Sequence, residues 1–179
     1  MTQITLAVTG SISAYKAADI TSQLTKLGLE VKVLMTPAAR KFITPLTLQV
    51  LSKHQVGLDV MIEDDPQRIE HIDIGKETDL FLVAPASANT IAKLAMGLAD
   101  NMVTSTALAL PQGTKKLLAP AMNTKMLEHP ATQRNLKLLQ DYGYQIIQPR
   151  DAILACGDKG SGALASVETI VETVKENCL

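Results

Sequence analysis

Two hydrophobic patterns alternate along the chain: short runs of consecutive apolar residues, and longer stretches with apolar residues at helical spacing. Consecutive apolar residues are typical of strands that are covered on both faces, as in a parallel sheet. The predicted strands span residues 4–9, 30–35, 80–84, 116–120 and 144–148. Helical segments lie between them, which is the order of elements in a doubly wound α/β sheet.

We therefore predict one α/β domain over residues 1–179. Its parallel sheet is expected to have about five or six strands with helices on both faces, a three-layer α/β/α arrangement of the Rossmann-like or flavodoxin-like type. Three glycines within residues 155–162 predict a mobile loop, and residues 167–177 predict a terminal amphipathic helix.

Polar side chains follow the central predicted strand, at residues 80–84. Pro85 is expected to end this strand, because proline cannot donate to the ladder. Ser87, Asn89 and Thr90 then stand at the start of the next predicted helix. Open α/β sheets bind ligands at the carboxyl ends of their strands, where free amides and the helix dipole favour an anion. We interpret the three side chains as a ligand site; a simple helix cap at Ser87 is the alternative.

Other strand ends carry small or polar residues at the same edge. Residues 10–13 (Gly-Ser-Ile-Ser) follow the first strand and lack the three glycines of a dinucleotide fingerprint, so we do not predict an NAD site. One glycine and two serines can hold a single phosphate, although a plain serine-capped turn has the same sequence. Thr36 opens the next predicted helix, and Asn123, after a strand that ends in Pro120, is expected at the same edge as Asn89.

Histidine is scarce, with His54, His71 and His129 as the three examples. His71 is expected between a polar surface loop and the central strand, and histidine is a common acid or base in catalysis. Asp73 is too close to it in an extended segment to face the same way, so no dyad is predicted. His54 is expected at the surface and His129 at a helix start.

The two cysteines have different settings. Cys178 is expected at a frayed chain end, whereas Cys156 lies in the glycine-rich segment. Cys156 is either an incidental residue of a flexible connector or, if the loop closes on a ligand, an acid, because a thiol can give up a proton near neutral pH.

The composition narrows the partners and the compartment. The formal net charge is −1, and no apolar run approaches the about 20 residues of a membrane helix, so neither nucleic acid nor a membrane is expected as a partner. The sequence starts without a signal-peptide pattern, and two cysteines make no disulfide framework. We therefore expect a cytoplasmic protein with free thiols. The acidic residues 63–65 are interpreted as solvated surface, so no metal site is predicted.

Several motifs together resemble those of the flavin-dependent cysteine decarboxylases, and the similarity is greatest to the members that act in coenzyme A synthesis. The motifs are residues 10–16, 42–47, 71–74, 85–90, 97–101, 120–123 with Met126, and 155–158. The resemblance runs nearly from end to end. In many bacteria this domain is fused to a synthetase; here the chain ends after the decarboxylase, so a stand-alone form is expected.

The resemblance implies FMN as the cofactor and phosphopantothenoylcysteine as the small-molecule substrate. The substrate's thiol would be oxidised to a thioaldehyde, carbon dioxide would leave, and the resulting enethiolate would be reduced, so the cycle has no net redox change. The residues implied to bind the cofactor are Gly10, Ser11, Ile12, Ser13, Thr36, Ser87, Ala88, Asn89, Thr90 and Ala121. The resemblance also implies a homotrimer, or an assembly of trimers, with FMN at the subunit boundary.

The same resemblance assigns roles to individual side chains. His71 would be the base or polarising group of the oxidation, Asn123 would hold the substrate carboxylate, and Cys156 would be the acid of the reduction. Met126 and Ala155 would contact the substrate alongside Asn123 and Cys156.

This chain departs from the family pattern at two places. Leu127 stands where the family usually has tryptophan, and Ala163 with Leu164 stand where it often has arginine and methionine. Without that arginine, the grip on an anionic group of the substrate would pass to Lys159 or Lys125.

Three alternative functions are open, and a fourth, a dinucleotide-dependent reductase, is disfavoured. A peptidyl-cysteine decarboxylase of lantibiotic synthesis shares His71, the motif at residues 85–90 and Asn123, and Cys156 favours the coenzyme A enzyme over it. A flavin prenyltransferase of the same fold would have different helix-start motifs and no need of Cys156. A non-catalytic regulatory relative that binds a phosphatase would not need His71, Asn123 and Cys156 together. A dinucleotide-dependent reductase would need the missing glycine fingerprint.

Overall fold

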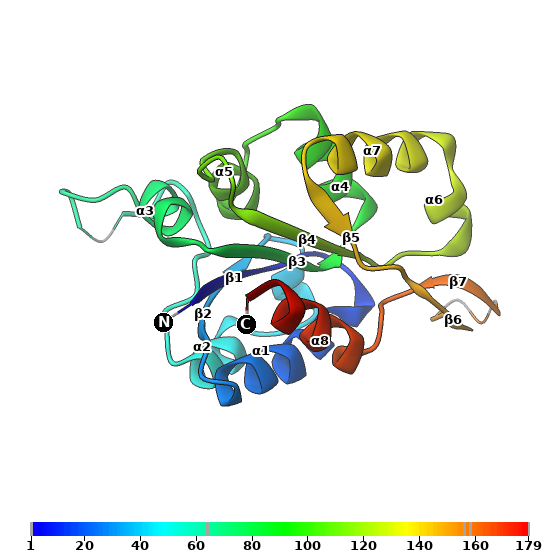
Figure 1. Cartoon of the computed structure of the whole chain (residues 1–179), viewed down its shortest axis with the longest axis horizontal. Helices are drawn as coiled ribbons and strands as arrows, with labels where there is room; N and C mark the ends of the chain where they lie inside the picture. Colours follow the sequence, from blue (N-terminus) through cyan, green and yellow to red (C-terminus); the bar gives the residue numbers. More distant parts are fainter. Residues whose placement is uncertain (1, 64, 156, 158, 179) are drawn as a thin grey trace.

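A five-stranded parallel sheet forms the centre of the molecule, with the strand order β2-β1-β3-β4-β5 (Figure 1). The computed structural model describes residues 2–63, 65–155, 157 and 159–178. The strands are β1 Gln3–Val8, β2 Glu30–Met35, β3 Leu80–Ala86, β4 Lys115–Pro120 and β5 Tyr144–Ile146. Each predicted strand is present, and the order is that of a flavodoxin-like doubly wound sheet.

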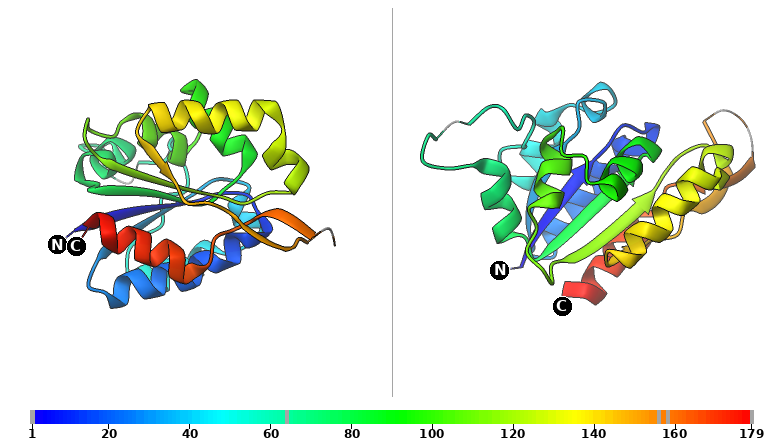
Figure 2. Two further views of the ribbon diagram at one scale, coloured as in Figure 1. Left: turned by 45° about the vertical axis from the view of Figure 1, so that its right-hand side comes forward. Right: turned by 90° about the horizontal axis from the view of Figure 1, so that it is seen from above.

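Helices cover both faces of this sheet, as predicted, and give three layers (Figures 1 and 2). On one face lie α1 Ala17–Lys26, α2 Pro45–Ser52 and α8 Val167–Cys178; on the other lie α4 Ala88–Met96, α5 Met102–Leu108 and α7 Pro130–Asp141. Helix α3 Glu70–Glu77 packs beside α5, and three short helices complete the set: η1 Ile12–Lys16, η2 Ala39–Lys41 and α6 Thr124–Glu128. Within the described ranges, no helix is long and apolar enough to cross a membrane.

The central strand β3 explains why its sequence is apolar at consecutive positions. Leu80, Leu82 and Ala84 belong to the hydrophobic cluster under α1 and α8. Phe81 and Val83 belong to the cluster under α4 and α5. All five side chains are fully buried, because alternate residues of a strand point to opposite faces and both faces of this sheet are covered.

Three local predictions are wrong. Pro85 does not end β3: the strand continues to Ala86, and only its register with β4 shifts between Val83 and Ala86, where the proline has no N–H to donate. Residues 71–74 are helical, in α3, and not extended. The helix predicted to open at Thr36 is only the short η2.

The glycine-rich segment also differs from the prediction. The strand β5 is followed by an antiparallel hairpin of β6 Arg150–Ile153 and β7 Lys159–Ala163. Residues 159–163 are therefore a paired strand and not the expected loop. The hairpin projects beyond the end of the sheet where the strands β1, β3 and β4 finish (Figures 1 and 2).

Candidate functional site

A cleft of about 560 Å³ lies at the carboxyl ends of the central strands. Its walls are the turn after β1, the start of α4, the segment after β4 and the β6–β7 hairpin. The cleft brings together most of the residues predicted from the sequence: Gly10, Ser11, Ile12, Ser13, Ser87, Ala88, Ala121, Asn123, Met126 and Ala155. This volume and this place in the sheet are typical of a small-molecule site.

The first wall is the turn after β1. Ser11 caps η1, since its Oγ accepts a hydrogen bond of 3.3 Å from the backbone N–H of Ser13. Gly10 packs directly against the chain that follows β2, so that an added Cβ would stand 2.6 Å from Cβ of Ala38. A side chain at position 10 would push these segments apart, which accounts for glycine at the base of the cleft.

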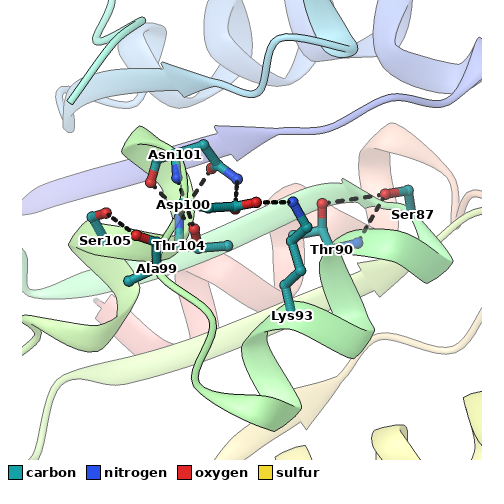
Figure 3. A network of polar contacts seen from close by, with 8 residues as sticks. All are labelled: Ser87, Thr90, Lys93, Ala99, Asp100, Asn101, Thr104 and Ser105. Carbon is teal, nitrogen blue, oxygen red and sulfur yellow. Dashed lines mark hydrogen bonds and ion pairs between the residues drawn. The ribbon is translucent and has the colours of Figure 1, made fainter. Parts of the chain in front are cut away.

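The second wall is the start of α4. The Oγ of Ser87 accepts from the backbone N–H of Thr90 at 3.2 Å and donates to Oγ1 of Thr90 at 3.2 Å (Figure 3). The first-turn amides of Ala88 and Asn89 have no carbonyl within the helix to bind. These amides and the positive end of the helix dipole make the wall suitable for an anion.

Thr9 connects these two walls, a role that the sequence analysis missed. It is the last residue before the Gly10 turn, and its side chain is fully buried. Its Oγ1 donates to the carbonyl oxygen of Pro85 at 2.7 Å and accepts from the backbone N–H of Ser87 at 2.9 Å. One hydroxyl therefore fixes the β3–α4 turn against the end of β1. The sequence signal that could have revealed this role is a threonine at the end of an apolar strand.

The third wall is the segment after β4 together with strand β7. Asn123 caps α6, with its Oδ1 accepting from the backbone N–H of Lys125 at 2.9 Å. The backbone N–H of Met122 donates to the carbonyl of Gly162 at 2.9 Å, and Oγ1 of Thr124 donates to the carbonyl of Ser161 at 2.5 Å. Strand β7 is thus joined by hydrogen bonds to both neighbours of Asn123.

Gly162 allows this close docking. Its φ is +126°, in the region that favours glycine, and an added Cβ would stand 2.3 Å from the carbonyl oxygen of Met122. The hairpin register shifts at the same place, between Arg150 and Asp151. A bulge at this position sets the direction in which Arg150 leaves the strand.

The charges that line the cleft are positive. Lys16 and Arg150 line it, and no aspartate or glutamate does so within the described ranges. Lys125 and Lys159, the cations suggested by the sequence, do not line it. Besides Lys16 and Arg150, the sequence analysis missed Tyr15, Phe42 and Gly162 as lining residues. Phe42 and Gly162 are far from Gly10 in the sequence, whereas Tyr15 and Lys16 lie in the motif at residues 10–16 and were not singled out there.

Several predicted site residues do not line the cleft. Thr36 is buried and its Oγ1 accepts from the backbone N–H of Ala39 at 3.2 Å. Asn89 is exposed, and Thr90 is buried behind Ser87. The structure therefore gives Thr90 a supporting position under Ser87. Cys156 lies outside the described residues.

His71 is also remote from the cleft of its own chain. Helix α3, which carries it, lies at the opposite end of the molecule from the β6–β7 hairpin (Figures 1 and 2). The Nδ1 atom of His71 is buried and has no hydrogen-bond partner in the part of the chain that the structure describes. Asp73 pairs with Arg68 at 2.9 Å, and this hydrogen bond lowers the pKa of the Asp73 carboxyl.

The motif at residues 97–101 joins two helices of one layer. Lys93 on α4 forms an ion pair with Asp100 at 2.5 Å, which lowers the pKa of that carboxyl (Figure 3). Asn101 and Thr104 form a capping box at the start of α5, with each side chain accepting from the other residue's backbone N–H. This network holds α5 against the helix that begins at Ser87.

The chain is similar to known proteins over nearly its whole length. The sequence model of the family described as Flavoprotein matches residues 1–179. The chain is 63% identical to the "Probable phosphopantothenoylcysteine decarboxylase" of Streptococcus mutans, over 97% of each protein. It is 45% identical to the "Coenzyme A biosynthesis bifunctional protein CoaBC" of Bacillus subtilis, of which it spans 42%.

Two solved structures give the same picture. A PPC decarboxylase mutant complexed with pantothenoylaminoethenethiol matches with a TM-score of 0.90 and 32% identity, over 98% of this chain and 97% of that one. "The FMN binding protein AtHal3" matches with a TM-score of 0.84 and 32% identity, over 98% of this chain and 95% of that one. The match in fold covers the cleft-forming segments as well as the sheet.

Proposed function

The chain belongs to the Flavoprotein family, and we propose on this premise that it is an FMN-dependent decarboxylase of coenzyme A biosynthesis. It converts phosphopantothenoylcysteine to phosphopantetheine. The observation that carries the proposal is the 63% identity, over nearly the whole of both chains, to a probable phosphopantothenoylcysteine decarboxylase. The cleft at the end of the sheet, lined by the family's motifs, supplies a suitable site.

The cleft fits a flavin mononucleotide. Its phosphate would be held by the turn at residues 10–13 and by Ser87 and Ala88 at the start of α4. Those walls offer hydroxyls and helix-terminal amides, and no carboxylate within the described ranges lines the cleft to repel a phosphate. When bound, FMN supplies a two-electron acceptor that returns the electrons at the end of the cycle. Ala121 is small and buried, and would leave room beside the ring system.

Asn123 positions the substrate carboxylate in this proposal. The hydrogen bond that its Oδ1 accepts from Lys125 fixes the plane of the amide at the start of α6. Met126, half exposed one turn further on, shields the substrate from water. Ala155 lines the cleft, and its neighbour Cys156 is proposed to donate the proton that completes the reduction of the enethiolate.

We assign the base or polarising role to His71 of another copy of the chain. In its own chain His71 is remote from the cleft, so the site requires an oligomer, a homotrimer or an assembly of trimers. Exposed apolar side chains around the cleft support the proposal that another subunit covers it: Ile12 and Tyr15 are each 57% exposed, and Phe42 is 48% exposed. The buried, unpartnered Nδ1 of His71 supports a role toward a group outside its own described chain.

The proposed acid is a thiol, which needs a reducing compartment, so we place the protein in the cytoplasm. The test is release of carbon dioxide from phosphopantothenoylcysteine by the purified protein, with and without bound FMN. We expect release that depends on FMN and is lost in the Asn123→Ala variant. Wild-type protein that holds FMN yet releases no carbon dioxide would overturn the proposal.

A further inference from the structure

We propose that Arg150 binds the phosphate of the substrate and thereby selects phosphopantothenoylcysteine over its unphosphorylated form. The inference rests on the proposed function. Its starting observation is the charge of the cleft, in which Lys16 and Arg150 are the only ionic side chains among the described lining residues. A described lining with two cations and no carboxylate favours anions, and the proposed substrate brings a phosphate in addition to that of FMN.

The hairpin register places Arg150 beside Ala163, one of the positions where this chain departs from the family pattern. Arg150 on β6 pairs directly with Ala163 on β7, and both residues line the cleft. The two residues are partners in the ladder next to the register shift, so their side chains start from neighbouring backbone positions. Ala163 stands where the family often has arginine, so Arg150 delivers a guanidinium to the same part of the cleft from the neighbouring strand.

The guanidinium is anchored at its Nε atom to the residue that follows strand β7. Its Nε donates to the carbonyl of Leu164 at 3.2 Å, and Leu164 is fully buried in the core. Strand β7 is in turn fixed to the Asn123 segment through the hydrogen bond from Met122 to Gly162. No acidic side chain among the described residues pairs with Arg150. As far as the described residues go, the terminal N–H groups of its planar fork have no carboxylate partner and can donate to two phosphate oxygens.

Two other anions could occupy this cleft, and the geometry disfavours both as partners of Arg150. The proposed function already places the phosphate of FMN at the Gly10 turn and Ser87, which belong to other elements than the hairpin. The substrate carboxylate loses its charge as carbon dioxide leaves, so a guanidinium bound to it would stabilise the ground state more than the transition state. A cation on the remote phosphate binds both states and leaves the reacting carboxylate to the neutral amide of Asn123.

The test compares ligands that differ only in the phosphate. Affinities of the FMN-loaded protein for phosphopantetheine and for pantetheine are measured by calorimetry in the wild type, Arg150→Gln and Arg150→Lys. We expect Arg150→Gln to weaken phosphopantetheine binding by about 10- to 100-fold, the effect of losing a charged hydrogen-bond pair, and to leave pantetheine binding unchanged. Arg150→Lys should lie between, because it keeps the charge and loses the fork.

Matched variants remove the two cations that the sequence suggested. Lys159→Gln and Lys125→Gln each delete one positive charge near the cleft without changing its lining, and both should keep the wild-type preference for phosphopantetheine. Loss of the preference in either lysine variant and its retention in Arg150→Gln would overturn the assignment.

Two further results would also overturn it. If Arg150→Gln weakened the binding of phosphopantetheine and of pantetheine equally, Arg150 would support the hairpin and would not bind the phosphate. Weaker FMN binding with unchanged riboflavin binding would mean that it reads the cofactor. Because these are affinities, they decide the role of Arg150 separately from carbon dioxide release, which decides the proposed function.

Discussion

Replacing Thr9 by valine should loosen the phosphate end of the cleft. Valine has nearly the same shape, but it removes the hydroxyl that donates to the carbonyl of Pro85 at 2.7 Å and accepts from the N–H of Ser87 at 2.9 Å. Thr9 is fully buried, so water cannot replace it as a partner without rearrangement. The turn at Gly10 and the start of α4 would then lose their direct connection.

The size of the effect follows from the two groups left unpaired. A buried polar group without a partner costs about 1–3 kcal/mol, and the Ser87 amide is only partly buried. We therefore expect Thr9→Val to lower the free energy of unfolding by about 2–4 kcal/mol. Thr9→Ser keeps the hydroxyl and loses one methyl group, which should cost about 1 kcal/mol.

The assay is equilibrium unfolding in urea at one fixed protein concentration, because subunit association would make stability depend on concentration. Affinity of the folded variants for FMN and for riboflavin is measured in parallel by flavin fluorescence. Thr9→Val should weaken FMN binding more than riboflavin binding, because the misplaced segment is the one proposed to bind the phosphate. Equal stability of the valine and serine variants would refute the energetic reasoning. Equal weakening of both flavins would reduce Thr9 to a general support of the fold.

Three further predictions concern the hairpin, the acid and the shared cleft. Gly162→Ala places a Cβ 2.3 Å from the carbonyl oxygen of Met122, so the substrate KM should rise about 10-fold or more through a displaced hairpin; an unchanged KM would contradict the docking described above. Cys156→Ser should release carbon dioxide yet accumulate the unsaturated enethiol, seen by mass spectrometry, and full turnover by this variant would remove Cys156 from the mechanism. His71→Asn and Asn123→Ala should each be inactive alone, and co-expressed subunits should recover part of the activity; no recovery in mixed oligomers of intact stability would mean that the cleft is not shared.

The sequence predicts the strands well because their signal is local. Strand β3 is covered on both faces, so its burial appears directly as a run of apolar residues from Leu80 onward. The end of such a strand is also recognisable, and the small and polar residues at Gly10, Ser87 and Asn123 do meet in one cleft. This follows from topology alone, since the carboxyl ends of neighbouring parallel strands share one edge.

The hairpin and its docking could not be predicted in the same way. Strand β7 is held by backbone hydrogen bonds to the segment after β4, and a backbone contact leaves no mark on residue type except the glycines that permit it. Glycine-rich sequence is equally typical of a loop, which is why the sequence predicts a mobile loop at residues 155–162, where the structure has most of β7. Arg150 lines the cleft because the hairpin docks there, so its position could not be predicted from the sequence either.

His71 shows a different limit. Residues 71–74 belong to an eight-residue helix, too short for helical spacing to be distinguished from an extended segment. The distance of His71 from the cleft depends on the packing of α3 beside α5. That packing is set by the arrangement of all the helices in the layer and not by the local sequence. Thr9 likewise acquires its role only because β1 and β3 are neighbours in the sheet.

The central claim is a decarboxylation that ends with no net oxidation, and the mass of the product tests it most directly. The FMN-loaded protein is incubated with phosphopantothenoylcysteine and the product is analysed by mass spectrometry. A product lighter by one carbon dioxide, which is phosphopantetheine, is the predicted result and establishes both the oxidation and the return of the electrons. A product lighter by carbon dioxide and two further hydrogens would contradict the account and would identify an oxidative decarboxylase of the peptidyl-cysteine kind.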